Sequence, residues 1–198
     1  SANKEERKGL QKPKLKIVSL NSTAISLKWK TDDDDESTDG FTLLYRKSKD
    51  ENWREKKLLP SETKHTLNNL DCGTLYIVSL SSFNSNGSSE NTQLVARTNG
   101  GPPAAANMRD LFRAGSTTIT INPDAIHDGG CAISKISVKF RNYGSREEYS
   151  SLYNDAYYPH RTITLQNARP STAIEFIVRA ENNAGSTEAN YVVVTTAP

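Results

Sequence analysis

The chain has 198 residues, 35% of them hydrophobic, and its 25 basic and 23 acidic residues leave a formal net charge of +2. Thr, Ser, Val and Ile outnumber the strong helix formers, which favours an all-β fold. Basic and acidic residues are nearly balanced in both halves of the chain. The composition therefore predicts no basic face and no nucleic-acid partner.

Neither the first residues nor the apolar runs indicate a membrane-embedded segment. No run of about 18 apolar residues exists and the first residues are polar, so we expect neither a membrane span nor a signal peptide in this chain, which is compatible with a piece of a larger protein. Residues 1–12 are charged and lack apolar periodicity. They are interpreted as a disordered lead-in without a function of their own.

Alternating apolar residues predict a series of strands in the first half. The pattern is clearest at Ile25, Leu27 and Trp29, where every second side chain is apolar, as in a strand with one face in a core. Trp29 is expected at the centre of that core. Strands are predicted around residues 15–20, 25–29, 41–45, 53, 65–67, 75–80 and 94–95.

Few residues in the chain suit metal binding or catalysis. The five consecutive carboxylates at 32–36 lack the alternating ligands and turn glycine of a calcium loop, so they are interpreted as a solvated loop. His65, His127 and His160 have no second His or Cys at metal-ligand spacing, which argues against zinc. Motifs of phosphate-binding loops and nucleophile elbows are absent, so we expect no enzyme, no cofactor and no small-molecule substrate.

One stretch of the sequence occurs twice. Residues 67–87 recur 98 residues later as residues 165–185, with Leu, Thr, Val, Asn and Gly positions in register. This period predicts two modules of about 100 residues each. A Gly-Gly-Pro-Pro stretch interrupts every periodicity between them. The predicted domains are 13–98 and 105–198, with a linker at 99–104.

The second half repeats the strand pattern but lacks two marker residues. Pro123 stands where Trp29 stood, and Ile174 stands where the first half has Tyr76. Leu80 and Val178 are predicted core residues at matching positions of the repeated strand. We expect this domain to begin at Met108 and Leu111, a turn at 128–131, and strands around residues 119–121, 136–140, 149, 163–165, 174–178 and 192–194.

Tyr76 begins a strand after a polar corner, and the stretch closes on Asn84-Ser85-Asn86-Gly87. This arrangement resembles the tyrosine corner of Greek-key β-sandwiches, in which a Tyr hydroxyl bonds back to the preceding corner. The sequence is similar to the E to G region of a fibronectin type III domain. The resemblance implies two tandem seven-stranded Greek-key β-sandwiches with an immunoglobulin-like fold.

Four strings narrow the resemblance within that class. They are Asn-Leu-Asp-Cys-Gly-Thr-Leu-Tyr at 69–76, Ser-Phe-Asn-Ser at 82–85, Asp-Gly-Gly-Cys-Ala-Ile at 128–133 and Glu-Asn-Asn-Ala-Gly-Ser-Thr at 181–187. Together, over residues 13–197, they resemble the membrane-proximal fibronectin type III pair of the Down syndrome cell adhesion molecule (Dscam) family. Ala132 stands where that family has a Pro.

This resemblance implies the extracellular part of a single-pass plasma-membrane receptor for neuronal cell adhesion. Other domains of such proteins perform homophilic recognition of same-family proteins on other cells. The chain would then be a non-catalytic stalk segment that spaces the recognition domains, with association in cis as a further role.

Two other classes of binding protein are alternatives. A cytokine-receptor-type pair would bind a protein ligand at the domain elbow, but such pairs carry disulfides within the first domain and a Trp-Ser-x-Trp-Ser string, and both are absent. A carbohydrate-binding module would expose a row of aromatics. Tyr153, Tyr157 and Tyr158 are the candidates, and their position beside Pro159 favours a loop or edge strand.

The remaining candidate sites are asparagines and cysteines. Asn21 and Asn86 each begin an Asn-x-Ser/Thr glycan acceptor, or else are plain surface residues. The strand order of the resembled fold places Cys72 at the end of domain one where the chain leaves, and Cys131 at the end of domain two where the chain arrives. We therefore predict an inter-domain disulfide in an extracellular protein, the alternative being two unrelated free thiols.

Overall fold

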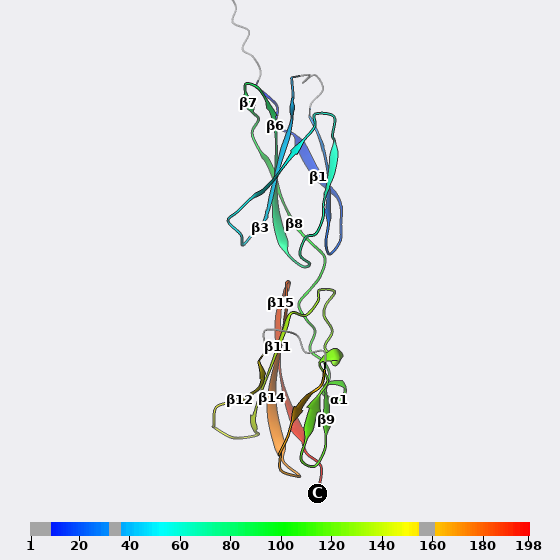
Figure 1. Ribbon diagram of the computed structural model, residues 1–198, viewed down its shortest axis with the longest axis vertical. Helices are drawn as coiled ribbons and strands as arrows, with labels where there is room; N and C mark the ends of the chain where they lie inside the picture. The colour runs from blue at the N-terminus through cyan, green and yellow to red at the C-terminus, as the bar shows by residue number, and fades with distance from the viewer. Residues whose placement is uncertain (1–8, 32–36, 155–160) are drawn as a thin grey trace, which may run out of the picture. The chain divides into compact units, whose positions relative to one another are not determined.

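The computed structural model describes residues 9–31, 37–154 and 161–198, which form two compact units, Ser1–Asn99 and Gly100–Pro198. Each unit is a sandwich of two antiparallel β-sheets (Figure 1). The predicted fold class is therefore confirmed. The acidic run at 32–36, together with Tyr157, Tyr158 and His160, lies outside the described residues.

Unit 1 is built from one three-stranded sheet and a larger sheet packed on it. The three-stranded sheet has the order β1-β2-β5, with β1 at Lys14–Leu20, β2 at Ile25–Lys30 and β5 at Lys64–Leu67. In the larger sheet β3 lies between β4 and β6, and β6 also pairs with β7 and β8. Their bounds are Gly40–Lys47 for β3, Arg54–Leu58 for β4, Leu75–Asn84 for β6, Gly87–Ser88 for β7 and Thr92–Arg97 for β8.

The core of unit 1 follows the predicted alternation along β2. Ile25, Leu27 and Trp29 are at most 2% exposed, whereas Lys28 and Lys30 between and after them face solvent. The Trp29 and Phe41 rings meet edge to face with centroids 5.7 Å apart. Other buried members include Leu43, Leu67, Tyr76, Val78 and Leu80. Trp53 was predicted on a strand but directly precedes β4, where its ring lies under the Arg46 guanidinium.

Unit 2 has the same two-sheet plan. One sheet has the order β13-β10-β9 and the other has the order β12-β11-β14-β15. The bounds are Phe112–Ala114 for β9, Ile119–Ile121 for β10, Lys135–Asn142 for β11, Ser150–Asn154 for β12, Ile163–Leu165 for β13, Ala173–Asn182 for β14 and Gly185–Val194 for β15. Tyr149, predicted on a strand, directly precedes β12.

Two short helical segments in unit 2 were not predicted. Met108 and Leu111, expected only to begin the domain, bound the helical turn α1, which buries Leu111. The 3-10 segment Pro123–Ala125 follows β10, and Asn122 caps it by accepting a hydrogen bond from the Asp124 amide at 3.2 Å. Proline suits the start of a helix because its missing N–H would have no intrahelical partner there.

Phenylalanine and tyrosine rings pack in the core of unit 2, which lacks a tryptophan. The Phe176 side chain is fully buried, and its ring centroid is 4.9 Å from that of Phe112. The Tyr191 ring packs edge to face on Phe112, with ring centroids 5.1 Å apart. Val178 lies in the same core. On β15 the buried residue is Val193, so Val192 and Val194, which were used to predict the strand, face outward.

Candidate functional site

The Cys72 loop joins β5 to β6 in unit 1 and is held by side chains from its own sandwich. The Tyr76 hydroxyl accepts a hydrogen bond from the Asp71 amide at 2.8 Å, which is the geometry of a tyrosine corner. Burial raises the pKa of the Tyr76 hydroxyl above its ordinary value of 10.0. Gly73 has φ = 56°, a left-handed conformation that glycine adopts without steric cost.

Thr98 ties the same loop to the end of the last strand of unit 1. Its hydroxyl accepts from the Thr74 amide at 2.9 Å and donates to the Asp71 carbonyl at 2.5 Å. The Thr74 hydroxyl donates to the Cys72 carbonyl at 2.7 Å, and the Gly73 amide donates to the Asn99 carbonyl at 2.9 Å. The backbone on both sides of Cys72 is thus fixed by hydrogen bonds.

Unit 2 repeats this threonine tether, which the sequence interpretation missed. The Thr195 hydroxyl accepts from the Thr172 amide at 2.9 Å and donates to the Arg169 carbonyl at 2.5 Å. Thr98 and Thr195 are 2% and 3% exposed, so a polar side chain is buried at the same place in both sandwiches. Thr74 and Thr172, whose amides donate these bonds and which stand 98 residues apart in the repeated stretch, were the available signal.

The Cys131 loop joins β10 to β11 in unit 2. Gly129 and Gly130 have φ values of 71° and 82°, and the Asp128 carboxylate accepts from the Gly130 amide at 2.9 Å. A Cβ on Gly129 would lie 2.5 Å from the carbonyl oxygens of Gly101 and Pro102. The predicted turn is therefore present, and only glycine fits at its centre. Cys131 is 2% exposed.

Asn182 at the end of β14 organises this end of unit 2. Its amide nitrogen donates to the Gly101 and Asp128 carbonyls at 2.8 Å each and to the Cys131 carbonyl at 3.0 Å. Its Oδ1 accepts from the amides of Ala184 and Gly185. One buried side chain thereby joins the first residues of the unit, the Cys131 loop and the β14-β15 turn.

Residues of the predicted linker 99–104 take part in these networks. The Asn99 amide donates to the Asn21 carbonyl within unit 1 at 3.0 Å. In unit 2 the Gly101 amide donates to the Gly129 carbonyl and the Ala104 amide to the His127 carbonyl. The Pro103 carbonyl accepts from the Thr187 hydroxyl. Hydrogen bonds within one unit or the other thus extend into both ends of the predicted linker.

The redox state of the two cysteines follows from the structure. Neither is a free thiol: Cys72 and Cys131 are both disulfide-bonded, and the chain has no third cysteine. The predicted alternative of two free thiols is therefore wrong.

The predicted glycan acceptors are both exposed and lie at opposite ends of unit 1. Asn21 is in the β1-β2 turn, where its Oδ1 accepts from the amides of Thr23 and Ala24 at 2.9 and 2.8 Å. Asn86 is at the tip of the β6-β7 hairpin, and its amide donates to Asn84 Oδ1 at 2.9 Å. Neither asparagine is part of the packed core.

The other candidate residues are not brought together. His65 is half-buried on β5, and His127 is exposed before the Cys131 loop. Tyr153 is half-buried on β12. Among the described residues, no three His, Cys, Asp or Glu side chains are grouped so as to hold a metal ion. No helix in the described ranges has the length and apolar character needed to span a membrane.

A polar cluster on the sheet of β11 and β14 joins Arg141, Tyr149 and Glu175. Arg141 Nε lies 3.1 Å from the Glu175 carboxylate, and the Arg141 guanidinium stacks over the Tyr149 ring at 4.1 Å. A hydrogen bond from the Tyr149 hydroxyl, reinforced by Arg141, holds the pKa of the Glu175 carboxyl below its ordinary value of 4.5. The same bond raises the pKa of Tyr149.

Two family models match the two units separately. Residues 11–98 match the fibronectin type III domain, and residues 114–198 match the DSCAM/DSCAML C-terminal Fn3-like domain. A two-domain fibronectin type III segment of chicken tenascin is 16% identical, with a TM-score of 0.49, and the match covers 92% of this chain and 98% of that one.

Sequence relatives are cell adhesion molecules. The chain is 29% identical over 187 residues to Cell adhesion molecule DSCAM of Homo sapiens and 30% identical over 186 residues to Cell adhesion molecule Dscam2 of Drosophila melanogaster. Each match covers 92% of this chain and 9% of the relative. Cell adhesion molecule DSCAML1 of Mus musculus is 30% identical over 176 residues, which are 87% of this chain and 8% of the relative. The chain thus spans less than a tenth of the length of these relatives.

Proposed function

Because the chain belongs to the DSCAM/DSCAML family of cell adhesion molecules, we propose that it is a non-catalytic stalk segment in the extracellular part of a single-pass plasma-membrane adhesion receptor. The observation that carries this proposal is the tandem of two sandwiches, each matching a family model over most of its length. In this role the segment spaces the recognition domains, which bind same-family proteins on other cells, and it presents a surface for association in cis.

The stalk role is tested in a full-length receptor that carries this segment. The segment is either deleted or replaced by an unrelated tandem of two β-sandwiches, and aggregation of cells expressing the receptor is measured. A spacer predicts that the replacement retains aggregation while the deletion weakens it. Loss of aggregation in the replacement, at equal surface expression, would show that the segment itself recognises the partner. Sedimentation velocity of this chain over a wide concentration range tests the association in cis.

We also propose that Cys72 and Cys131 bond to each other and restrain the orientation of the two units. Supporting this pairing, they are the chain's two cysteines, both are disulfide-bonded, and each lies in a loop fixed by hydrogen bonds. A chain-entropy estimate for a loop of this length gives about 4 kcal/mol. Since the loop spans two units with separate cores, most of the effect is a narrower range of orientations rather than a higher melting temperature.

Non-reducing peptide mapping of the folded monomer tests the pairing. We expect one cross-linked peptide containing Cys72 and Cys131, which separates into two on reduction. Recovery of the two cysteines in separate alkylated peptides, or in cross-links between two chains, would reject it. The same digest tests glycan occupancy at Asn21 and Asn86, because enzymatic removal of an N-linked glycan converts its asparagine to aspartate.

A further inference from the structure

The outer face of the sheet β1-β2-β5 carries a concentration of lysines that the composition did not predict. These three strands contain five lysines and no Asp or Glu. All five are exposed, because they occupy the positions that alternate with the core residues. The members of this lysine face are Lys14, Lys16, Lys28, Lys30 and Lys64. The prediction of no basic face is therefore wrong for this sheet.

Strand register places these lysines directly beside one another. Lys14 is opposite Lys30, while Lys16 is opposite Lys28, which is in turn opposite Lys64. Neighbouring strands lie about 4.8 Å apart, and residues two positions apart on one strand are separated by about 7 Å. The face thus presents a row of three ammonium groups across the sheet and a second row of two beside it.

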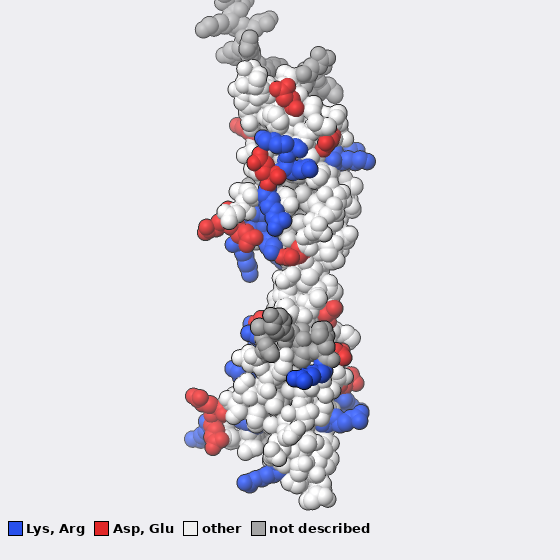
Figure 2. Space-filling view, viewed as in Figure 1, with Lys and Arg blue, Asp and Glu red and all other residues white. Residues whose placement is uncertain are grey.

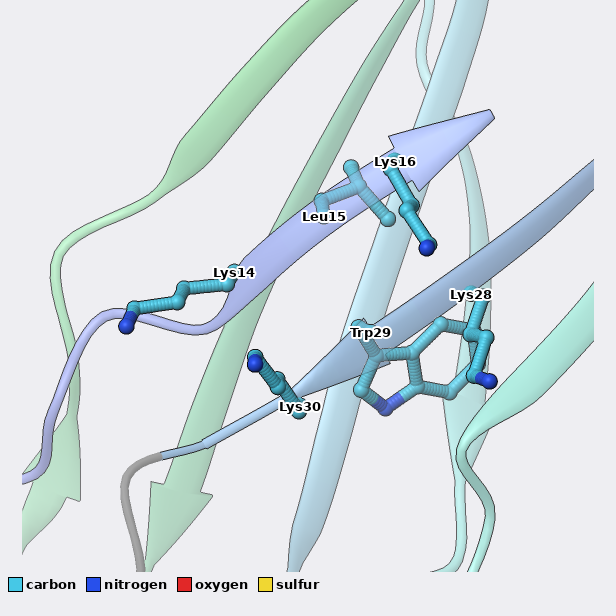
Figure 3. Close-up of a pocket in the computed structure, with 6 residues that line it drawn as sticks. All are labelled: Lys14, Leu15, Lys16, Lys28, Trp29 and Lys30. Atoms are coloured by element: carbon cyan, nitrogen blue, oxygen red, sulfur yellow. The ribbon is translucent and has the colours of Figure 1, made fainter. Parts of the chain in front are cut away.

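A hollow of about 330 Å³ lies on the β1-β2 part of this face. It is lined by Lys14, Lys16, Lys28 and Lys30 together with Leu15 and Trp29 (Figure 3). By contrast, Lys and Arg are interspersed with Asp and Glu over the face of unit 1 that Figure 2 shows. The hollow is a recess between β1 and β2 next to the two rows of lysines.

Internal ion pairing does not explain four of the five lysines. Lys47 pairs with Asp71 and Lys57 with Glu55, but within the described ranges Lys16, Lys28, Lys30 and Lys64 make no ion pair. Like charges directly opposite each other destabilise a sheet. The acidic run at 32–36 follows Lys30 closely in sequence and lies outside the described residues. A binding affinity measured on the whole chain includes the electrostatic effect of this run on the lysine face.

Protection of sheet edges explains only part of the pattern. Lysines on edge strands prevent pairing with other chains, and β1 and β5 are the edges of this sheet. Lys28 and Lys30, however, lie on the central strand β2. The fold does not require them either, because the corresponding sheet of unit 2, β9-β10-β13, has Arg113 as its single charged residue.

We propose that the lysine face binds a linear sulfated polysaccharide. An extended chain with closely spaced anionic groups matches rows of ammonium groups on a flat sheet, as polyelectrolytes bind by releasing counterions. Single-stranded nucleic acid would need exposed aromatics for base stacking. Apart from His65, these strands carry one aromatic side chain, Trp29, and it is buried. The choice of a polysaccharide as the polyanion rests on the proposed extracellular location. The arrangement of the lysines is observed and does not depend on that proposal.

The test measures binding of a fluorescent heparin octasaccharide to the whole chain at 0.15 M NaCl. The variant K16Q/K28Q/K64Q removes the row of three, and K49Q/K56Q/K139Q removes three exposed lysines elsewhere, so both lower the net charge equally. Since exposed charge contacts are individually weak, losing three weakens binding by about tenfold. The row variant also has a smaller dependence of affinity on salt. The control variant changes the affinity less than twofold.

Three results would overturn the proposal: equal losses in the two variants, no measurable binding by the wild type, or tighter binding of a single-stranded DNA dodecamer than of the octasaccharide. Tighter binding of the DNA would leave a cationic face but reject the polysaccharide and would not bear on the stalk role. Thermal unfolding serves as the folding control. The row variant is expected to melt at or above the wild-type temperature, because like charges facing one another across the strands have been removed.

Discussion

Replacing Trp29 by alanine is expected to unfold unit 1 and leave unit 2 folded. Trp29 is 2% exposed and packs edge to face on Phe41, in a core cluster separate from that of unit 2. Truncation of a buried Trp to Ala costs about 3–5 kcal/mol. Domains of this size have a stability of about 5–15 kcal/mol, so the loss takes between about a fifth and all of the stability of unit 1, and the unit unfolds if its stability lies at the low end of that range.

The indole N–H adds a second, finer expectation. Trp29 Nε1 is buried and has no hydrogen-bond partner among the described residues. An unsatisfied buried donor costs about 1–3 kcal/mol, and Trp29→Phe removes it while retaining a ring against Phe41. We therefore expect Trp29→Phe to cost less than half as much as Trp29→Ala.

Amide hydrogen exchange measured peptide by peptide separates the two units. Trp29→Ala should remove protection from the strands of unit 1 and leave β11, β14 and β15 protected. The matched control is Phe176→Ala, which truncates a fully buried ring in unit 2. Phe176→Ala should remove protection from the strands of unit 2 and leave those of unit 1 protected. The fluorescence of Trp29 and Trp53, the chain's two tryptophans, should stay native. Loss of protection in both units from either variant would refute the argument that the cores are independent.

Two further predictions concern hydrogen bonds in each unit. Tyr76→Phe should destabilise unit 1 by about 1–2 kcal/mol in denaturant unfolding, because the Asp71 amide loses its acceptor. The control is Tyr45→Phe, which should have little effect because the Tyr45 hydroxyl has no hydrogen bond among the described residues. In unit 2 the depressed pKa of Glu175 contributes stability that is present above about pH 4.5 and lost as the pH falls through the folded-state value. Melting of unit 2 from pH 7 to pH 3 should therefore fall more steeply in the wild type than in Glu175→Gln, and parallel curves would contradict the assignment.

The sequence predicted those parts of the fold that depend on local periodicity. Alternation at Ile25, Leu27 and Trp29 gave the strand and its buried face, since the pleat sends every second side chain into the core. Trp53 and Tyr149 were placed on strands that begin one residue later, because an aromatic at a strand end carries no periodicity of its own. The turn α1 was missed because a single helical turn is too short for a helical period.

The sequence could not show the features that depend on pairing between distant residues. A buried Asn182 with five partners looks the same in the sequence as the exposed Asn183 beside it, and the tethers of Thr98 and Thr195 reach back more than twenty residues. The lysine face was missed for a related reason. The balanced net charge hides it, and only the register of β1, β2 and β5 brings its members together.

The two sandwiches therefore share a plan but differ in how each fixes its cysteine loop. In unit 1 the loop is held from within the sandwich by the Tyr76 and Thr98 hydroxyls, which both bond to Asp71. In unit 2 the threonine tether is retained at a loop without a cysteine, and Asn182 instead fixes Cys131 together with Gly101. A loop that is already ordered loses little further entropy when it is cross-linked. Both loops are thus ordered enough to suit the disulfide that we propose between Cys72 and Cys131.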